Sequence, residues 1–118
     1  MKKILGAAVL ALTFVVGLHA YDYTTFKQLT IDATAGGIGF TATDIQAGNG
    51  HVQATQASCR AETAEMRYTI DGTTVTSSVG MLLEVGDVVI ISGTQYLLNL
   101  RAIRTTSTSG GLSCTIVG

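Results

Sequence analysis

The residues that could do chemistry in this 118-residue chain are few and widely spaced. The chain has two histidines, and only His51 lies outside a leader-like segment at the amino terminus. Serine is abundant, so a Ser-His-Asp relay is possible on paper, but no elbow motif places a serine on a strained turn. We therefore interpret His51 as a hydrogen-bonded or surface residue, and the sequence predicts no catalytic residue and no enzyme.

Metal and cofactor chemistry has little more support. The two cysteines, Cys59 and Cys114, stand far apart, and no CxxC or HxxxH spacing occurs. The carboxylates are scattered singly along the chain, as Asp22, Asp32, Asp44, Glu62, Glu65, Asp71, Glu84 and Asp87. Calcium at one of the turn aspartates is a minor alternative. The glycine stretch 35–40 lacks the Lys-Ser/Thr ending of a phosphate-binding loop and predicts a flexible loop. We expect no metal and no cofactor.

The charge balance excludes one class of partner. Only 13% of the residues are charged, the formal net charge is −1 and the sequence pI is about 6.0. A typical soluble domain has about 25% charged residues, so Thr, Ser, Gly and Asn must cover this surface. Binding to nucleic acid normally needs a clustered Lys/Arg face, so nucleic acid is not an expected partner.

The first twenty residues have the three parts of a secretory signal. A basic start, Met1-Lys2-Lys3, is followed by the apolar run 4–18, expected to be helical, and by Ala20, after which we predict cleavage. A spanning helix needs about 20 apolar residues, but the lysines could lengthen this run, so a retained anchor is the alternative. Membrane contact is expected only through residues 1–20, and only if they are not cleaved, and residues 21–118 are expected to form one folded domain.

Export would give the cysteines a structural role. Two cysteines in a small exported β domain most often pair, so Cys59 and Cys114 are predicted to form a disulfide. Closing a loop of about 55 residues would stabilise the fold by about 4 kcal/mol in the chain-entropy model. Two separate buried thiols are the alternative.

The pattern after residue 20 predicts an all-β fold. Short β-branched runs alternate with a period of two between Gly, Asp and Asn turns, and no sustained helical period occurs. About seven short strands in under 100 residues favour an immunoglobulin-like β-sandwich, with a small β-barrel or jelly roll as the alternative. The expected strands are 25–33, 51–62, 66–70, 79–83, 88–91, 95–104 and 112–117, with a possible edge at 73–77.

Three details of this interpretation are specific. Residues 40–45 form either a short strand or a helical turn. Cys59 shares a face with Ala57 and Ala61, and Cys114 shares one with its apolar neighbours, so a disulfide would join inward faces between or within layers. The aromatic residues Tyr21, Tyr23 and Phe26 either hold a first strand on the core or form an arm that docks on a neighbouring subunit.

The segment 66–76, Met-Arg-Tyr-Thr-Ile-Asp-Gly-Thr-Thr-Val-Thr, resembles the R-Y-T-x-D-G-T-x-P-T hairpin of immunoglobulin-like accessory domains, including those of chitobiase-type enzymes. The stretch 60–117 more closely resembles small structural proteins encoded among bacteriophage head and tail genes. Their G-x-L-L-E-x-G-D and N-F-R-A-I-R-T motifs correspond to residues 80–87 and 99–105, and Tyr21-Asp22-Tyr23-Thr24 resembles their start. Val75 replaces the usual proline. The resemblance implies no catalytic residues.

We therefore expect a non-enzymatic structural protein of a phage virion, in capsid decoration or head–tail joining. The alternative is an exported bacterial surface or periplasmic module of adhesin or pilin-like type, favoured by the leader and the cysteine pair. In both cases the expected partners are proteins, through self-association or a capsid or surface lattice. A carbohydrate-binding domain is a third hypothesis, opposed by the absence of tryptophan.

Overall fold

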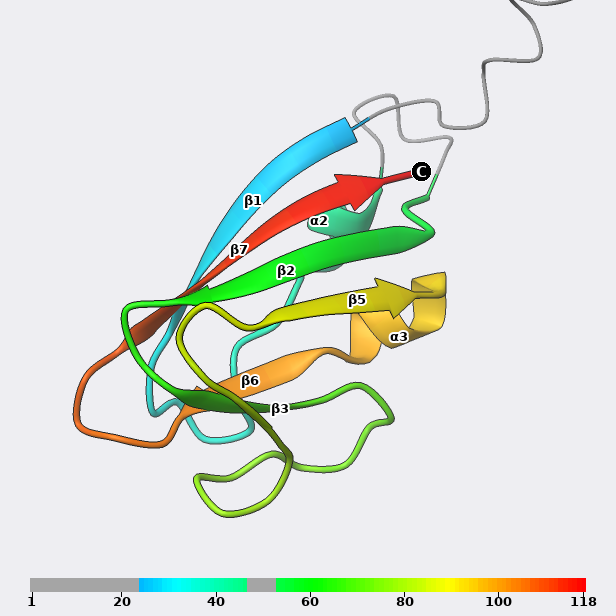
Figure 1. Ribbon diagram of the computed structural model, residues 1–118. Coiled ribbons are helices and arrows are strands. Elements are labelled where there is room, and N and C mark those ends of the chain that lie inside the picture. The colour runs from blue at the N-terminus through cyan, green and yellow to red at the C-terminus, as the bar shows by residue number, and fades with distance from the viewer. Residues whose placement is uncertain (1–23, 47–52) are drawn as a thin grey trace, which may run out of the picture.

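The computed structural model describes residues 24–46 and 53–118, and within them the chain is predominantly β (Figure 1). The leader at residues 1–20, the aromatic residues Tyr21 and Tyr23, the turn at 48–50 and His51 lie outside the described residues. The elements are β1 (Thr24–Ile31), α2 (Ala42–Ile45), β2 (Gln56–Glu62), β3 (Met66–Thr69), β4 (Met81–Leu83), β5 (Val88–Ser92), α3 (Thr94–Asn99), β6 (Arg101–Arg104) and β7 (Gly110–Val117).

The strands form two antiparallel sheets. The four-stranded sheet has the order β1-β7-β2-β5, and the three-stranded sheet has the order β4-β3-β6. In Figure 1 the first sheet lies above β3 and β6 of the second, so the arrangement is compatible with the predicted β-sandwich. β1 pairs with β7 along its whole length, and Thr24 at its start lies opposite Val117 near the carboxyl terminus.

Period-two alternation explains why one face of each strand is buried. Along β2, Ala57, Cys59 and Ala61 are completely buried, whereas Ser58 and Arg60 are exposed. β7 continues this inner face with its own apolar residues. The largest completely buried side chains are Ile31, Ile45, Met66, Ile91, Leu97, Leu100, Leu112 and Ile116. The predicted inward faces around both cysteines are therefore confirmed.

The structure corrects the predicted strand at 95–104. Residues Thr94–Asn99 form helix α3, and only Arg101–Arg104 form a strand. Gly93 has a φ of 121°, which breaks the extended backbone after β5. Leu97 then falls on the inner side of one helical turn, and Leu100 follows three residues later, so both are completely buried. Helical spacing places both leucines on the buried side, whereas strict alternation in a strand would place them on opposite faces.

The ambiguous segment 40–45 contains a helical turn. Thr41 is its N-cap and accepts a hydrogen bond from the Asp44 backbone N–H, while the Asp44 carboxylate accepts one from the Thr41 N–H. This reciprocal pair is a capping box, which fixes where a four-residue helix begins. Phe40 and Ile45 on either side of the cap are buried, so α2 is held by packing as well. The possible edge strand at 73–77 is not a strand.

The glycine stretch, which the sequence predicts to be a flexible loop, is packed against β6. The Ile38 N–H donates to the Ala102 carbonyl and the Ala102 N–H donates to the Ile38 carbonyl, each at 2.8 Å. A Cβ on Gly39 would overlap the Leu100 carbonyl oxygen, so glycine here permits close backbone approach. The stretch therefore covers the free edge of β6.

We predict that Gly39→Ala lowers the free energy of unfolding by about 3 kcal/mol, because overpacking against backbone must displace the segment from β6. The matched variant Gly36→Ala meets no atom within 4 Å, but Gly36 has a φ of 84°. Its cost is about 1 kcal/mol of backbone strain. Urea unfolding of both variants measures the difference, and equal losses would contradict close packing at Gly39.

Candidate interaction surface

The described residues contain no cluster of three or more His, Cys, Asp or Glu side chains able to hold a metal ion. In residues 24–46 and 53–118, no helix is both long enough and apolar enough to cross a membrane. The features to consider are therefore the disulfide, the residues of the phage-like motifs and the exposed apolar side chains.

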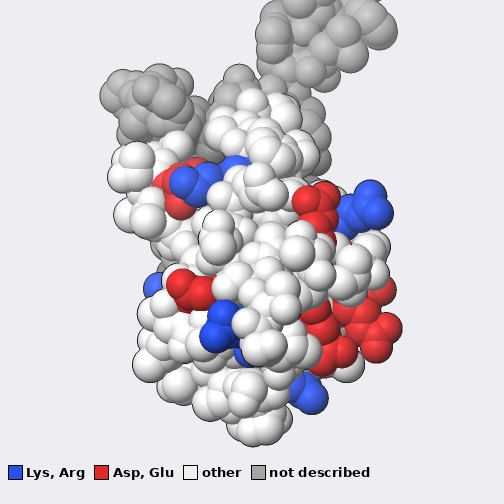
Figure 2. Space-filling view, turned by 90° about the vertical axis from the view of Figure 1, so that its left-hand side faces the viewer, with Lys and Arg blue, Asp and Glu red and all other residues white. Residues whose placement is uncertain are grey.

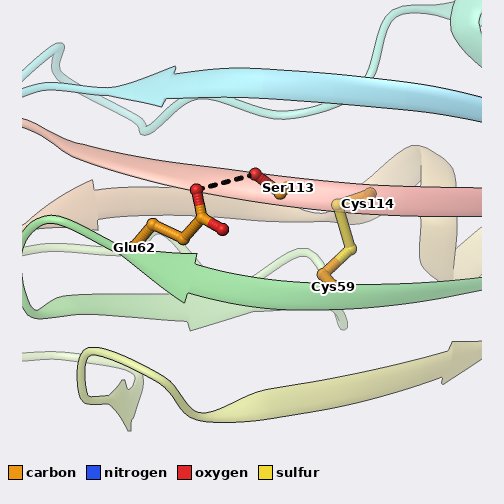
Figure 3. Close-up of a disulfide and its surroundings, with 4 residues drawn as sticks. All are labelled: Cys59, Glu62, Ser113 and Cys114. Atoms are coloured by element: carbon orange, nitrogen blue, oxygen red, sulfur yellow. Dashed lines mark hydrogen bonds between the residues drawn. A yellow bond between two sulfur atoms is a disulfide. The ribbon is translucent and has the colours of Figure 1, made fainter.

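The disulfide joins Cys59 of β2 to Cys114 of β7 within the four-stranded sheet (Figure 3). The two residues are direct register partners with a Cα–Cα distance of 4.1 Å, and both are completely buried. Antiparallel partners without mutual backbone hydrogen bonds approach to about 4.5 Å, which suits such a link. The predicted pairing is therefore present, it lies within one layer, and the alternative of two free thiols does not apply.

The outer face beside the disulfide is polar. Ser113 Oγ donates a hydrogen bond to Glu62 Oε2 at 3.1 Å, linking β7 to β2 on the side opposite the core (Figure 3). Both side chains are partly exposed. This pair is therefore a surface contact between neighbouring strands, and the disulfide itself is shielded from solvent on the inner side.

The phage-like motifs account for the three-stranded sheet. Segment 66–76 contains β3, segment 80–87 contains β4, and segment 99–105 contains β6, with β3 pairing to both others. Three motifs that are separate in the sequence thus form one continuous sheet. The residues that carry the resemblance therefore lie together in one sheet.

The charged residues of the R-Y-x-x-D-G motif hold a loop in place. Arg67 donates hydrogen bonds to the carbonyls of Ser77 and Gly80, at 3.2 and 2.9 Å. Asp71 accepts a hydrogen bond from the Thr73 N–H at 3.0 Å. An aspartate that bonds the backbone two residues onward forms an Asx turn, so these side chains fix the chain between β3 and β4.

The other motif residues also have structural partners. Asp87 accepts a hydrogen bond from the Glu84 N–H at 2.9 Å, which closes the turn between β4 and β5, and Gly86 in that turn has a φ of 93°. Arg101 is partly buried and donates to the carbonyls of Leu98 and Leu100. A half-buried guanidinium bonded to two carbonyls is occupied in the fold, so Arg101 is a poor candidate for an anion site.

Local hydrogen bonds lower the pKa of three aspartates. The Thr34 hydroxyl and N–H lower the pKa of Asp32, and the Thr73 N–H lowers that of Asp71. Burial raises the pKa of Asp44, but hydrogen bonds from Thr41 and the neighbouring Lys27 ammonium, 3.4 Å away, lower it by more. All three carboxylates therefore stabilise loops in their ionised form, as expected for turn residues.

Most of the exposed apolar side chains lie close together in the sequence. Within residues 24–46 and 53–118, eight large hydrophobic side chains are exposed, and six of them fall between residues 79 and 90. We call these six the β4–β5 surface: Val79, Met81, Leu82, Val85, Val88 and Ile90. Their exposed fractions run from 44% to 64%. Single exposed apolar residues are ordinary, whereas a group of them makes this part of the chain the candidate for an interaction surface.

The two sides of the sandwich are closed differently. At the β1–β6 side, the Arg104 N–H donates to the Asp32 carbonyl at 3.1 Å, and the glycine stretch covers β6. At the opposite side, β4 and β5 are the outer strands of the two sheets and are joined only by the turn 84–87. The β4–β5 surface therefore comes mainly from these two outer strands and the turn between them, with Val88 and Ile90 on the outer face of the four-stranded sheet.

A shallow apolar hollow adjoins this surface. It has a volume of about 450 Å³ and lies where β3 ends and β4 begins. Its apolar lining comes from Tyr68, Ile70, Val79 and Met81. Val79 and Met81 belong to the β4–β5 surface, so the hollow extends the same apolar region toward β3 of the three-stranded sheet.

Figure 2 shows the end of the molecule formed by the turns at the left of Figure 1. Acidic and basic side chains are interspersed on this face and separated by wide uncharged areas. The charges do not form a field of one sign here, which suits contact with another protein surface better than with a polyanion.

Sequence reasoning missed the β4–β5 surface. The run 88–91 is continuously apolar, but the structure buries only Ile91 fully and leaves Val88 and Ile90 exposed. Phe26 is likewise 66% exposed on the outer face of β1, so its predicted alternative of holding the strand on the core is wrong. One sequence signal could have revealed this surface. The apolar run 88–91 directly follows the turn 84–87, and no polar residues alternate with its apolar ones.

Comparisons of the chain with protein-family models, with curated proteins and with solved structures gave no significant match.

We predict that removing the disulfide costs about 4 kcal/mol of unfolding free energy, because the unfolded chain regains the entropy of a loop of about 55 residues. Urea unfolding of the wild type with and without a reductant measures this loss. The double variant Cys59→Ala/Cys114→Ala should be about as unstable as the reduced protein and insensitive to reductant. A reductant effect that persists in the variant would contradict the assignment.

We also predict a loss of stability in acid. Because the folded pKa values of Asp32, Asp44 and Asp71 lie below the ordinary 3.8, their contribution is complete well above that pH. It is lost as the pH falls through the lowered values. The triple Asp→Asn variant should show a shallower decline in unfolding free energy between neutral pH and about pH 2. Parallel declines in wild type and variant would contradict the prediction.

Proposed function

We propose that this chain is a non-enzymatic structural protein that works by docking onto protein neighbours, as a capsid-decoration or head–tail component of a phage virion. The observation that carries the docking role is the β4–β5 surface, where six large apolar side chains stand exposed on β4, on β5, on the turn between them and just before β4. Burying a partly exposed apolar side chain contributes about 1 kcal/mol, so these residues together favour association.

The virion setting is supported by the motifs of the three-stranded sheet. Residues 66–76, 80–87 and 99–105 resemble segments of small phage structural proteins. In this chain the charged residues of those segments bond to loop backbone, as Arg67 and Asp71 do, and this leaves them no evident chemical task. Such a sheet serves as a scaffold, and its function belongs to the surfaces that it presents.

The disulfide favours a second candidate, an exported bacterial surface or periplasmic module of adhesin or pilin-like type. Disulfides persist in oxidising compartments and are rare in cytosolic proteins. The completely buried Cys59–Cys114 bond and the signal-like residues 1–20 are consistent with export. This candidate shares the docking role and differs in the partner and the compartment.

Mass spectrometry of purified virions from the encoding genome tests the first candidate. We expect peptides of this chain in stoichiometric amounts in gradient-purified particles, and their absence would exclude a virion role. In the same samples, peptide mapping of the native amino terminus and of the cysteines separates the candidates. A start at Tyr21 with an oxidised Cys59–Cys114 pair in a cell-envelope fraction, and not in particles, would establish the exported module instead.

A further inference from the structure

The backbone of β5 has an unpaired edge. The Ala61 N–H donates to the Asp87 carbonyl and the Gly93 N–H donates to the Thr55 carbonyl, so residues 87 and 93 point toward β2. Backbone groups alternate in direction along an antiparallel strand. The N–H and C=O groups of Val88, Ile90 and Ser92 therefore point away from β2, and no described strand pairs with them.

The free edge of β5 lacks the usual protection. Natural edge strands are blunted by charged side chains, proline or bulges, because an open edge recruits another strand. From Val88 to Ser92 the chain has no charge and no proline, and Val88 and Ile90 are 58% and 62% exposed on the outer face. An edge of this composition is suited to strand addition.

The other edge of the same sheet is protected. β1 carries Lys27 on its inward-facing side, in register with Cys114, and its ammonium lies 3.4 Å from the Asp44 carboxylate. An inward-pointing charge at an edge strand opposes the addition of a further strand, since that strand would cover the charge. The two edges therefore differ, and the sheet is open to extension mainly through β5.

We infer that the partner at this edge is a second copy of the same chain, joined β5 to β5 in antiparallel orientation about a two-fold axis. A register centred on Ile90 places each Ile90 opposite its counterpart and each Val88 opposite Ser92 of the other copy. This register satisfies every backbone group on the free edge. The two four-stranded sheets become one continuous sheet, with Val88 and Ile90 of both copies in one apolar patch.

The charges are compatible with this pairing. Glu84 and Asp87 lie in the turn before β5, so the two-fold axis carries the acidic turns to opposite ends of the joined strands. Asp87 then faces Gly93 of the other copy, and like charges do not meet. A parallel β5 pair would bring the acidic turns together, which costs free energy. The antiparallel dimer is therefore favoured by both hydrogen bonding and charge.

The inference gives the proposed docking role a specific partner and rests on it. The virion role and the dimer can nevertheless be excluded by different results. Absence from virions would exclude the virion role without affecting self-association, and a strictly monomeric protein would exclude the dimer while leaving docking on other proteins open.

Sedimentation velocity of the purified full-length gene product tests the inference. We expect a concentration-dependent species of twice the monomer mass, with a dissociation constant in the micromolar range, because a short strand edge buries less area than a standard interface. Ile90→Lys should raise this constant at least roughly tenfold, since like charges would then face each other across the axis. Val88→Lys is a second variant expected to act in the same direction.

Phe26→Lys is the matched control. Phe26 and Ile90 lie in one cross-strand row of the outer face, through Thr115 and Ser58, and have similar exposure at the two opposite edges. The control should dimerise like the wild type. Equal weakening by Phe26→Lys would overturn the two-fold dimer in favour of head-to-tail extension, and dimers that survive both β5 substitutions would also overturn it.

Amide hydrogen exchange supplies a direct readout of the edge. In the wild type, the N–H groups of Val88, Ile90 and Ser92 should become protected as the concentration rises, and in Ile90→Lys this protection should be lost. A monomer at every concentration, or protection of β1 amides instead, would overturn the inference.

Discussion

The pairing of β2 with β7 is the interaction on which the rest of this structure depends. β7 lies between β1 and β2, so it carries both the amino-terminal strand and the remainder of the sheet. The disulfide ties β7 to β2 at the centre of their register, between side chains that are completely buried. A domain of this size has a small core, and a cross-link that restricts the unfolded chain compensates for it.

With that pairing fixed, the second sheet has a different kind of support. Its strands are only three or four residues long, and the connection from β3 to β4 has no regular structure of its own. Arg67, Asp71 and Asp87 hold its turns through backbone hydrogen bonds. Polar side chains therefore fix the turns of this sheet while Met66, Leu83 and Ala102 pack into the core, whereas the first sheet adds a covalent bond to its apolar packing.

Alternation along the chain was sufficient to predict the all-β class, most strand positions and the inward direction of both cysteines. It did not predict α3, because a helix of six residues is too short to show a sustained period of 3.6 residues. It also could not reveal that the glycine stretch bridges to Ala102, since this contact depends on long-range packing. The exposed edge of β5 was missed for a similar reason, because an apolar strand has the same sequence pattern whether it is a central strand or an edge strand.

The opposition of Thr24 and Val117 in the β1–β7 pair has a practical consequence. Both ends of the folded unit leave from one pole, and the turns 62–66, 84–87 and 105–109 gather at the other (Figure 1). A tag, carrier or fluorescent protein joined directly before Thr24 or after Gly118 would thus emerge from the same pole. The far pole would stay unobstructed, so the domain could be displayed on a carrier with that pole facing outward.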